Sequence, residues 1–307
     1  MKVVYMGTPD FAVGPLEAII EAGHEVTAVV TQPDKPRGRG KEMAASPVKE
    51  CAQKHGIPVL TPVKIKAAEA VAQLREYPAD IFVVAAFGQI LSEEILQMPK
   101  HGCVNIHASL LPKYRGAAPI QWSIIDGETE TGVTIMQMDR GLDTGDILFQ
   151  QKVPITSEDT GESLFDKLAE AGSALITEAL VKIEKGDVHP VKQDDAKSCY
   201  AKMLTKAAGK IDWSKSAAEI ERLVRGLNSW PSAYTEYKGK QLKIWKAKVM
   251  PAMEGAPGTI AKVTKDQVIV CTGDGALALE EIQLEGKKRM CMKEFLLGRS
   301  FEEGEAL

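Results

Sequence analysis

The sequence predicts an α/β protein with two domains: a mostly parallel sheet with helices on both faces, then a small β-barrel. In the first half, short apolar runs alternate with helical patterns, as they do in a parallel sheet that is covered on both sides. In the last third, short strand patterns are separated by glycine-rich turns, which is typical of a barrel. The length of 307 residues also exceeds that of one typical domain.

The elements of the first half follow from β-branched runs and helical periodicity. Residues 3–6 predict a buried strand, and Asp10 is placed to cap a helix that continues to residue 22. The run at 26–31 is rich in valine and threonine and predicts a second strand. The other elements expected here are a helix at 45–55, a strand at 58–60, a helix at 66–76 and a fully apolar strand at 81–85.

The second half begins with a long helical pattern and ends in short strands. The helix at 158–185 is followed by a polar segment with glycine and proline, which we interpret as a linker. The domains are therefore expected at 1–189 and 209–307, with the linker at 190–208. The second domain should contain a helix at 217–227 and strands at 241–249, 258–263, 268–271 and 277–282.

The charge distribution indicates where a polyanion could bind. The chain has a net charge of −4, yet residues 206–250 contain 10 basic against 4 acidic residues. A basic segment on an acidic protein suggests a surface for nucleic acid, and a solvated face is the simpler alternative.

The cysteines and the N-terminus limit the class of protein. The five cysteines are scattered without a Cys-x-x-Cys pair, which argues against a disulfide framework and a structural zinc site, and we expect each thiol to be buried. The first residues lack a signal-peptide pattern, and no apolar run is long enough to span a bilayer. We therefore expect a cytoplasmic protein without membrane segments, and a monomer by default.

Two loops of the first half lie where a ligand could bind. The turn at 7–10 lacks the Gly-x-Gly-x-x-Gly and Walker spacings, which disfavours nicotinamide chemistry and nucleotide hydrolysis. The segment at 35–41 carries four cationic residues, among them Arg37, Arg39 and Lys41, between glycines and prolines. It predicts a charged loop at the carboxyl end of the second strand, suited to phosphate contact or simply solvated.

The strongest candidate site combines a strand end with an acidic loop. Residues 104–109 alternate like a strand, so Asn105 and His107 point to one side. An asparagine amide can donate to a developing oxyanion, and an imidazole can donate or relay a proton. The loop at 138–146 supplies three carboxylates, of which one near His107 would fix its tautomer.

Asn105, His107 and Asp143, with the segment Ser-Leu-Leu-Pro at 109–112, resemble the signature of the folate-dependent formyltransferases. The resemblance covers nearly the whole chain and is strongest for members that act on initiator tRNA. It implies a Rossmann-like first domain, an OB-like second domain, and transfer of formyl from 10-formyltetrahydrofolate to methionine on initiator methionyl-tRNA. The three residues would be catalytic, and the reaction would need no metal and no obligate protein partner.

The resemblance also implies two binding surfaces. A folate pocket is expected at two loops and the turn between them, with the residues Phe87, Gly88, Gln89, Ile90, Leu91, Ser109, Leu110, Leu111, Pro112, Met138, Asp139 and Gly141. The family more often has tyrosine where this chain has Phe87. Candidate contacts to tRNA are Arg37, Arg39, Lys41, Lys206, Lys210, Arg225, Lys243, Lys246 and Lys248. Trp230 and Tyr234 could stack on bases, although core packing is the expected role of both.

Other functions remain open from the sequence. The same chemistry could act on a glycinamide ribonucleotide or an amino sugar nucleotide, or water could replace the amine in a folate hydrolase. A protein of another class, an RNA-binding protein without catalysis, would use the barrel alone. The second domain and the cationic loop favour tRNA as the acceptor, and the three polar residues favour an enzyme.

Overall fold

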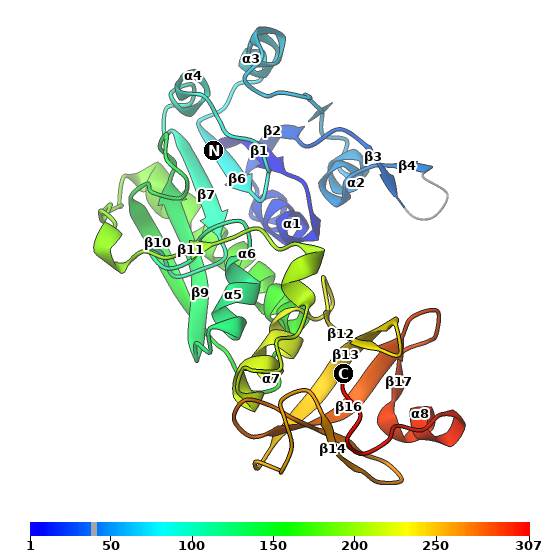
Figure 1. Ribbon diagram of the computed structural model, residues 1–307. Coiled ribbons are helices and arrows are strands. Elements are labelled where there is room, and N and C mark those ends of the chain that lie inside the picture. The colour runs from blue at the N-terminus through cyan, green and yellow to red at the C-terminus, as the bar shows by residue number, and fades with distance from the viewer. Residues whose placement is uncertain (38–41) are drawn as a thin grey trace. The chain divides into compact units, whose positions relative to one another are not determined.

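The computed structural model describes residues 1–37 and 42–307, and the chain divides into two compact units. The first unit contains Met1–Gly116, Glu130–Pro154 and Phe165–Ala201, and the second contains Ala117–Thr129, Ile155–Leu164 and Lys202–Leu307. Figure 1 shows the elements of both units, which are described separately below.

A seven-stranded sheet forms the centre of the first unit (Figure 1). Its strands are β1 (Lys2–Gly7), β2 (Glu25–Val30), β5 (Val59–Leu60), β6 (Ile81–Ala85), β7 (Cys103–His107), β9 (Glu130–Gln137) and β10 (Ile147–Pro154). The spatial order is β10-β9-β7-β6-β1-β2-β5. Within this sheet, β1, β2, β5, β6 and β7 pair in parallel, whereas β9 is antiparallel to both β7 and β10. The mostly parallel sheet is thereby confirmed.

Helices cover both faces of this sheet. They are α1 (Val13–Glu21), α2 (Pro47–Lys54), α3 (Ala68–Arg75), α4 (Glu93–Leu96) and α6 (Gly161–Lys185). On one face, Val4 of β1 belongs to the same core cluster as Leu74 of α3. On the other face, Tyr5 donates a hydrogen bond to the carbonyl of Ala12 at 2.6 Å. On α6, a Cβ added to Gly172 would lie 3.1 Å from a methyl group of Ile106, so this helix packs closely on β7.

The starts of α2 and α1 differ in their capping, and one expectation about them was wrong. Helix α2 begins with Pro47 after Ser46, whose hydroxyl accepts a hydrogen bond from the backbone of Lys49 at 3.1 Å. Asp10 was expected to cap the first helix, but it lies in a 3-10 helix at Asp10–Ala12. The N-cap of α1 is Ala12, which has no side-chain oxygen to accept a hydrogen bond.

Two short strand pairs complete the first unit. Strands β3 (Lys35–Arg37) and β4 (Glu42–Ala44) are antiparallel, and β8 (Arg115–Gly116) pairs in parallel with β11 (Tyr200–Ala201). Strand β11 and a 3-10 helix at Asp195–Lys197 lie inside the segment 190–208 that was expected to be a linker. The first part of this segment therefore belongs to the first unit, because it pairs with the site loop that follows β7.

The second unit is built on an antiparallel sheet. Its strands are β12 (Ala233–Tyr237), β13 (Lys240–Met250), β14 (Ile260–Val263), β15 (Val268–Cys271), β16 (Ala276–Leu284) and β17 (Met290–Cys291). The order is β12-β13-β16-β15-β14, and β17 also pairs with β16. The helices are α5 (Pro119–Ile125), α7 (Ala217–Gly226) and α8 (Met292–Gly298), with a 3-10 helix at Lys206–Gly209. Buried residues from β12 to β16, α7 and α8 form one core.

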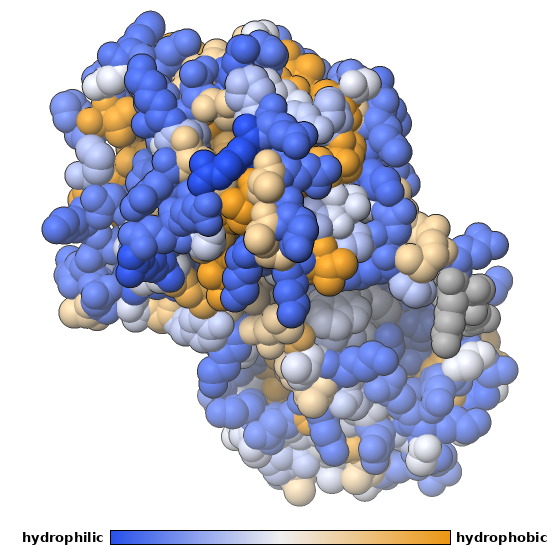
Figure 2. Space-filling model, turned by 90° about the horizontal axis from the view of Figure 1, so that it is seen from above, coloured by the Kyte–Doolittle hydropathy of each residue, from blue (hydrophilic) through white to orange (hydrophobic). Residues whose placement is uncertain are grey.

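The face drawn in Figure 2 is covered mainly by hydrophilic residues, and its hydrophobic side chains occur in small groups. Within the part of the chain that the structure describes, no helix combines the length and apolar character that a membrane span requires.

All five cysteines are free. Cys51, Cys103 and Cys271 are buried as expected, whereas Cys199 and Cys291 are exposed. The expectation that every thiol is buried was therefore wrong for two of them, because both lie in short segments at the surface of their units.

Candidate active site

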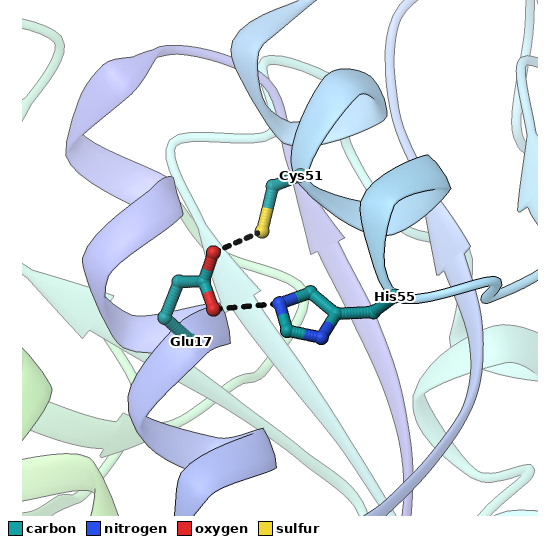
Figure 3. A group of neighbouring side chains, drawn as sticks. All are labelled: Glu17, Cys51 and His55. Atoms are coloured by element: carbon teal, nitrogen blue, oxygen red, sulfur yellow. Dashed lines mark hydrogen bonds and ion pairs between the residues drawn. The ribbon is translucent and has the colours of Figure 1, made fainter.

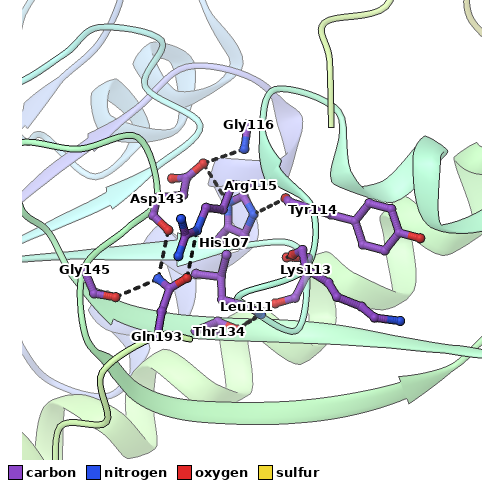
Figure 4. Close-up of polar contacts among 11 residues, drawn as sticks. His107, Leu111, Lys113, Tyr114, Arg115, Gly116, Thr134, Asp143, Gly145 and Gln193 are labelled. Carbon is purple, nitrogen blue, oxygen red and sulfur yellow. Dashed lines mark hydrogen bonds and ion pairs between the residues drawn. The ribbon is translucent and has the colours of Figure 1, made fainter. Parts of the chain in front are cut away.

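His107 ends β7 between two polar partners (Figure 4). Its Nε2 donates to the carbonyl oxygen of Tyr114 at 2.8 Å, and its Nδ1 lies 3.7 Å from Oδ2 of Asp143. The side chains of His107 and Asp143 are only 7% and 11% exposed. A carbonyl oxygen only accepts hydrogen bonds, so Nε2 carries a proton. A second N–H, at Nδ1, exists only when the ring is an imidazolium facing the carboxylate.

Asp143 is held by its backbone as well as by its carboxylate. Its φ of +54° lies in the left-handed region, which non-glycine residues rarely adopt. The backbone N–H of Gly116 donates to Oδ2 of Asp143 at 2.8 Å. This bond joins the loop after β9 to the segment after β7, so two loops far apart in the sequence are fixed at one point.

Gln193 fixes the same loop from a third segment (Figure 4). Its amide Nε2 donates to the carbonyl of Asp143 at 2.8 Å and to that of Gly145 at 2.7 Å. Its Oε1 accepts from Nε of Arg115 at 3.0 Å. Both the oxygen and the nitrogen of the Gln193 amide thus bond to the site loops. Through its bond to the Asp143 carbonyl, Gln193 positions that residue.

The loop at 138–146 is shaped by internal contacts. Oδ1 of Asp139 accepts from the backbone of Gly141 at 2.9 Å and from Oγ1 of Thr144 at 2.7 Å. A Cβ added to Gly145 would lie 1.7 Å from the carbonyl oxygen of Gln137, so only glycine fits there. In the structure, therefore, the Asp139 carboxylate shapes the loop, and Asp143 is the one that faces the imidazole.

Asn105 lies two residues before His107 on β7 and shares its side of the strand. It is half-buried, and β7 is fixed on both sides by β6 and β9. The structure therefore brings His107 and Asp143 into contact and presents the Asn105 amide on the same side of the same strand.

The turn after β7 is tied to the antiparallel strands. Oγ of Ser109 donates to the carbonyl of Lys113 at 2.6 Å, and Oγ1 of Thr134 donates to the carbonyl of Ser109 at 2.7 Å. The amide of Gln150 donates to the carbonyl of Leu111 at 2.9 Å. Ser109, expected in the folate pocket, is fully buried and uses its hydroxyl to hold this turn.

The loop after β6 also has internal roles for some of its side chains. Phe87 is 2% exposed and packs in the core, and its backbone carbonyl accepts a hydrogen bond from Nε2 of Gln32 at 3.2 Å. The side chain of Gln89 bonds to the backbone at 62–65, through both its oxygen and its nitrogen. Ile90, in contrast, is 75% exposed.

The expected folate residues fall into two groups. Buried among them are Phe87, Leu91, Ser109 and Leu111. Half-buried or exposed are Gly88, Gln89, Ile90, Leu110, Pro112, Met138, Asp139 and Gly141. Only the second group, together with backbone groups of the first, can meet a ligand directly.

The basic residues expected to contact tRNA differ in their exposure and in the contacts that they make within the protein. Arg39 and Lys41 lie outside the described residues, and Arg37 ends β3. Lys206, Lys210 and Lys248 are exposed. The other three have partners within the second unit, as follows.

Three of these cations are already in contact with groups of the protein. Arg225 donates to the carbonyl of Asp159 at 2.7 Å and forms an ion pair with Glu221. Lys246 lies 3.3 Å from a carboxylate oxygen of Glu280, and Lys243 lies over the ring of Trp245. The expected core packing of Trp230 was wrong, because this residue is 56% exposed; Tyr234 is half-buried.

Sequence reasoning missed Gln193, Thr134 and Gln150. Each acts through hydrogen bonds to backbone carbonyls or to the turn after β7, and none belongs to a recognisable motif. Gln193 was assigned to a linker, and only the three-dimensional structure shows that this polar residue bonds to a loop about 50 positions earlier.

A side-chain amide and an imidazole on one strand end, facing a carboxylate, define a site for acyl transfer, because they can stabilise an oxyanion and move a proton. Residues 1–180 match the formyl transferase family, and residues 203–300 match its C-terminal domain. The chain belongs to the formyl transferase family.

Two relatives are similar to this chain over nearly their whole length. Methionyl-tRNA formyltransferase from Agathobacter rectalis is 55% identical over 305 residues, which cover 99% of this chain and 98% of that protein. Methionyl-tRNA formyltransferase from Lachnospira eligens is 56% identical over 310 residues, with the same coverage of 99% and 98%.

Solved structures support the fold. The N-formyltransferase from Helicobacter canadensis, in complex with folinic acid and dTDP-3-aminofucose, has a TM-score of 0.68 at 22% identity and covers 94% of this chain and 100% of that chain. HypX from Aquifex aeolicus, in complex with tetrahydrofolic acid, has a TM-score of 0.65 at 18% identity and covers 96% of this chain and 47% of that chain.

Proposed function

We propose that this chain transfers the formyl group of 10-formyltetrahydrofolate to the α-amino group of methionine on initiator methionyl-tRNA, giving N-formylmethionyl-tRNA. The observation that carries the proposal is the contact of His107 with Asp143 beside Asn105 on β7. The acceptor is supported by relatives named methionyl-tRNA formyltransferase, which are 55% and 56% identical over nearly their whole length.

The three polar residues have separate roles. Negative charge develops on the formyl oxygen when the amine attacks, and the Asn105 amide and the Nδ1–H of a protonated His107 can donate to it. The Asp143 carboxylate pairs with that imidazolium and can accept the amine proton, directly or through water. The proton then passes to N10 of folate as the bond between the formyl carbon and N10 breaks and tetrahydrofolate leaves. The formyl group arrives activated on folate, so these side chains supply oxyanion stabilisation and proton transfer without a metal.

The folate is held, in this proposal, by the loop after β6 and the loop after β9. Ile90 and Leu142 are 75% and 53% exposed and offer apolar surface to a flat ring. Ala86 and Gly88 have positive φ values, +46° and +80°, and both residues are exposed, so a ligand can reach backbone groups of the first loop. Backbone groups can recognise the polar ring edge, while the buried side chains keep both loops fixed.

We propose that tRNA contacts basic residues of the second unit and of the segment 35–41. Lys206, Lys210 and Lys248 are exposed and carry charges that can contact phosphates. Arg225 and Lys246 face carboxylates of their own unit, so their contribution to tRNA binding should be smaller. The proposal requires the two substrates and no protein partner.

A cytoplasmic location is part of the proposal. All five cysteines are free, which suits a reducing compartment, and aminoacylated tRNA is used there.

A small amine is the second candidate acceptor. The fold is shared with enzymes such as WlaRD, a sugar 3N-formyl transferase solved in the presence of dTDP and 5-N-formyl-THF, at a TM-score of 0.67. At 23% identity that likeness extends to the fold alone. The much higher identity to the tRNA-acting relatives favours tRNA.

The test is a product assay with the full chain. Purified protein is incubated with 10-formyltetrahydrofolate and methionyl-tRNA, and the aminoacyl group is analysed after alkaline release. We expect formylmethionine with the wild-type protein and none above background with Asp143→Ala. Consumption of folate without this product would reject tRNA as the acceptor, and no consumption at all would reject the enzyme.

A further inference from the structure

A second group of reactive side chains lies between α1 and α2, on elements that carry none of the proposed catalytic residues (Figure 3). It consists of Glu17, Cys51 and His55, and one ligand atom of each lies within 4.8 Å of the others. The thiol of Cys51 donates to Oε1 of Glu17 at 3.2 Å, and Nε2 of His55 lies 2.7 Å from Oε2. One carboxylate thus receives both other groups.

Helical spacing explains why the three groups converge. Cys51 and His55 are four residues apart at the end of α2, which places them on the same face, and Glu17 faces them from α1. Two ligands one helical turn apart are a common way of presenting a pair of donors to a metal. None of the three side chains belongs to a Cys-x-x-Cys pair, which is the spacing that marks many zinc sites in a sequence.

The donor types select the class of metal. A thiolate sulfur, an imidazole nitrogen and a carboxylate oxygen together suit Zn²⁺, at distances of about 2.3, 2.0 and 2.0–2.2 Å. Mg²⁺ and Ca²⁺ prefer oxygen donors alone. Cys51 is buried, whereas the side chains of His55 and Glu17 are 34% and 37% exposed, so a metal would have protein on one side and water on the other.

We propose that Glu17, Cys51 and His55 bind one Zn²⁺ ion, with water as the fourth ligand, in a site that joins α1 to α2. On binding, the thiol proton leaves to solvent as sulfur bonds to zinc, and His55 binds through the Nε2 lone pair with its proton on Nδ1. The ligands lie on α1 and α2, which carry none of the proposed catalytic residues, so the ion would link the two helices and take no part in formyl transfer. The ion would hold α2 against α1 next to the hairpin of β3 and β4.

The alternative is that the three side chains form only hydrogen bonds between the two helices and bind no metal. Burial raises the pKa of Cys51 to about 12, so without metal the thiol stays protonated and weakly reactive. A redox role is therefore disfavoured, and the choice lies between a metal site and a set of helix–helix hydrogen bonds.

Cobalt titration of the metal-free full chain distinguishes the two. Co²⁺ substitutes for Zn²⁺, and a cysteine ligand gives a sulfur-to-cobalt charge-transfer band that no oxygen or nitrogen ligand produces. We expect the band to saturate at one Co²⁺ per chain and to disappear when one equivalent of Zn²⁺ is added. No charge-transfer band in the wild-type protein would overturn the proposal.

Matched variants locate the site. Cys51→Ser should abolish the band, and Glu17→Gln or His55→Gln should weaken metal binding by at least about tenfold. Cys291→Ser and His189→Gln, both exposed, are the controls and should leave the titration unchanged. A band that persists in Cys51→Ser would contradict the assignment.

A thermal measurement keeps the proposal testable if the buried Cys51 variant does not fold. Zn²⁺ should raise the Tm of the wild-type protein, with a much smaller rise for His55→Gln, whose side chain is partly exposed. An equal rise in both proteins would also overturn the site. No folate or tRNA is present in either experiment, so the result is independent of the proposed function.

Discussion

The two nitrogens of His107 have different partners, and this difference defines the chemistry at the scale of the residue. Nε2 is fixed by the carbonyl of Tyr114, so the ring cannot turn away from the site. Nδ1 faces the carboxylate of Asp143, which is itself held by the backbone N–H of Gly116. The imidazole therefore keeps one orientation, and its charge state decides whether Nδ1 can donate.

Asp143→Asn separates the charge of this residue from its geometry. The amide oxygen can still accept from Gly116, but the negative charge beside His107 is lost. We expect kcat for formyl transfer to fall by about 10²–10⁴-fold, the usual range for a positioned acid–base group. Circular dichroism should be unchanged, and the exposed Asp166→Asn is the matched control. A kcat within a few fold of wild type would contradict the role of this carboxylate.

Sequence patterns identified the candidate site residues for a physical reason. Asn105 and His107 lie two apart in a strand, and that period makes their common side predictable. The pattern of residues predicted only that a carboxylate of the loop lies near His107. The contact with Asp143 depends on the conformation of a loop with a left-handed residue, and this conformation could be seen only in the structure. Gln193 was not predictable, since nothing local to it indicates a partner in that loop.

At the scale of elements, residues 191–201 hold the site loop at 138–146 in place. Residues 191–201 pair with β8 and β10 and carry Gln193 to the site loop. A polar segment that appears to be a linker in the sequence thus stabilises the strained backbone at Asp143.

Gln193→Ala tests whether this segment positions Asp143. The variant loses two hydrogen bonds to loop carbonyls, each worth about 1 kcal/mol, so we expect roughly tenfold lower kcat with little change in KM for folate. Lys192→Ala, at the exposed neighbouring position, is the control. A purely structural role elsewhere would lower Tm and leave kcat per folded molecule unchanged, which would refute positioning.

Helix α7 gives a prediction about stability. Oγ of Ser216 accepts from the backbone of Glu219 at 3.2 Å, and the Glu219 carboxylate accepts in return from Ser216 at 3.0 Å. Ser216→Ala should lower the free energy of unfolding by about 1 kcal/mol in denaturant titrations. Ser300→Ala is an exposed control. Equal stability of the Ser216 variant and wild type would show that the cap is dispensable.

The same cap predicts a pH dependence. The hydrogen bonds from Ser216 lower the pKa of Glu219 in the folded protein. A lowered pKa stabilises the folded state above the unfolded-state pKa, and the effect is lost as the pH falls through the folded value. The difference in the free energy of unfolding between wild type and Ser216→Ala should therefore be smaller in acid. Denaturant titrations of both proteins at pH 7 and near pH 3 measure it, and an equal difference at both pH values would contradict the prediction.

The predicted elements show which patterns carry information. The buried strands β1, β6 and β15 were correct because continuous apolar runs mark them. Strand β10 was missed because it lies at the sheet edge and most of its residues are exposed or half-buried. Strand β12 was missed because polar residues alternate with only three buried ones.

At the scale of the whole molecule, the two units are not two continuous pieces of sequence. Segments 117–129 and 155–164 group with the C-terminal part, so the expected boundary at 190–208 differs from the structural division. Linear composition could place the basic segment and the antiparallel sheet, but it could not assign α5 to the second unit. That assignment depends on packing, since Ala118 shares a core cluster with Leu204 and Leu227.

The charge of the second unit gives a prediction on tRNA use. Lys206→Ala combined with Lys210→Ala should raise KM for methionyl-tRNA and leave KM for folate unchanged. The slope of log KM against log salt should fall by about 1–2, because fewer counterions are released. Lys64→Ala with Lys66→Ala, an exposed pair in the first unit, is the matched control. Equal effects of both pairs would point to net charge alone.

The identity of the acceptor can be measured directly by comparing three amines as substrates. Methionyl-tRNA, free methionine and an amino sugar nucleotide are offered to the wild-type protein with 10-formyltetrahydrofolate, and kcat/KM is measured for each. We expect methionyl-tRNA to be preferred by orders of magnitude, and we expect this preference to decline in the variant with both Lys206→Ala and Lys210→Ala. A higher kcat/KM for the amino sugar nucleotide would contradict it.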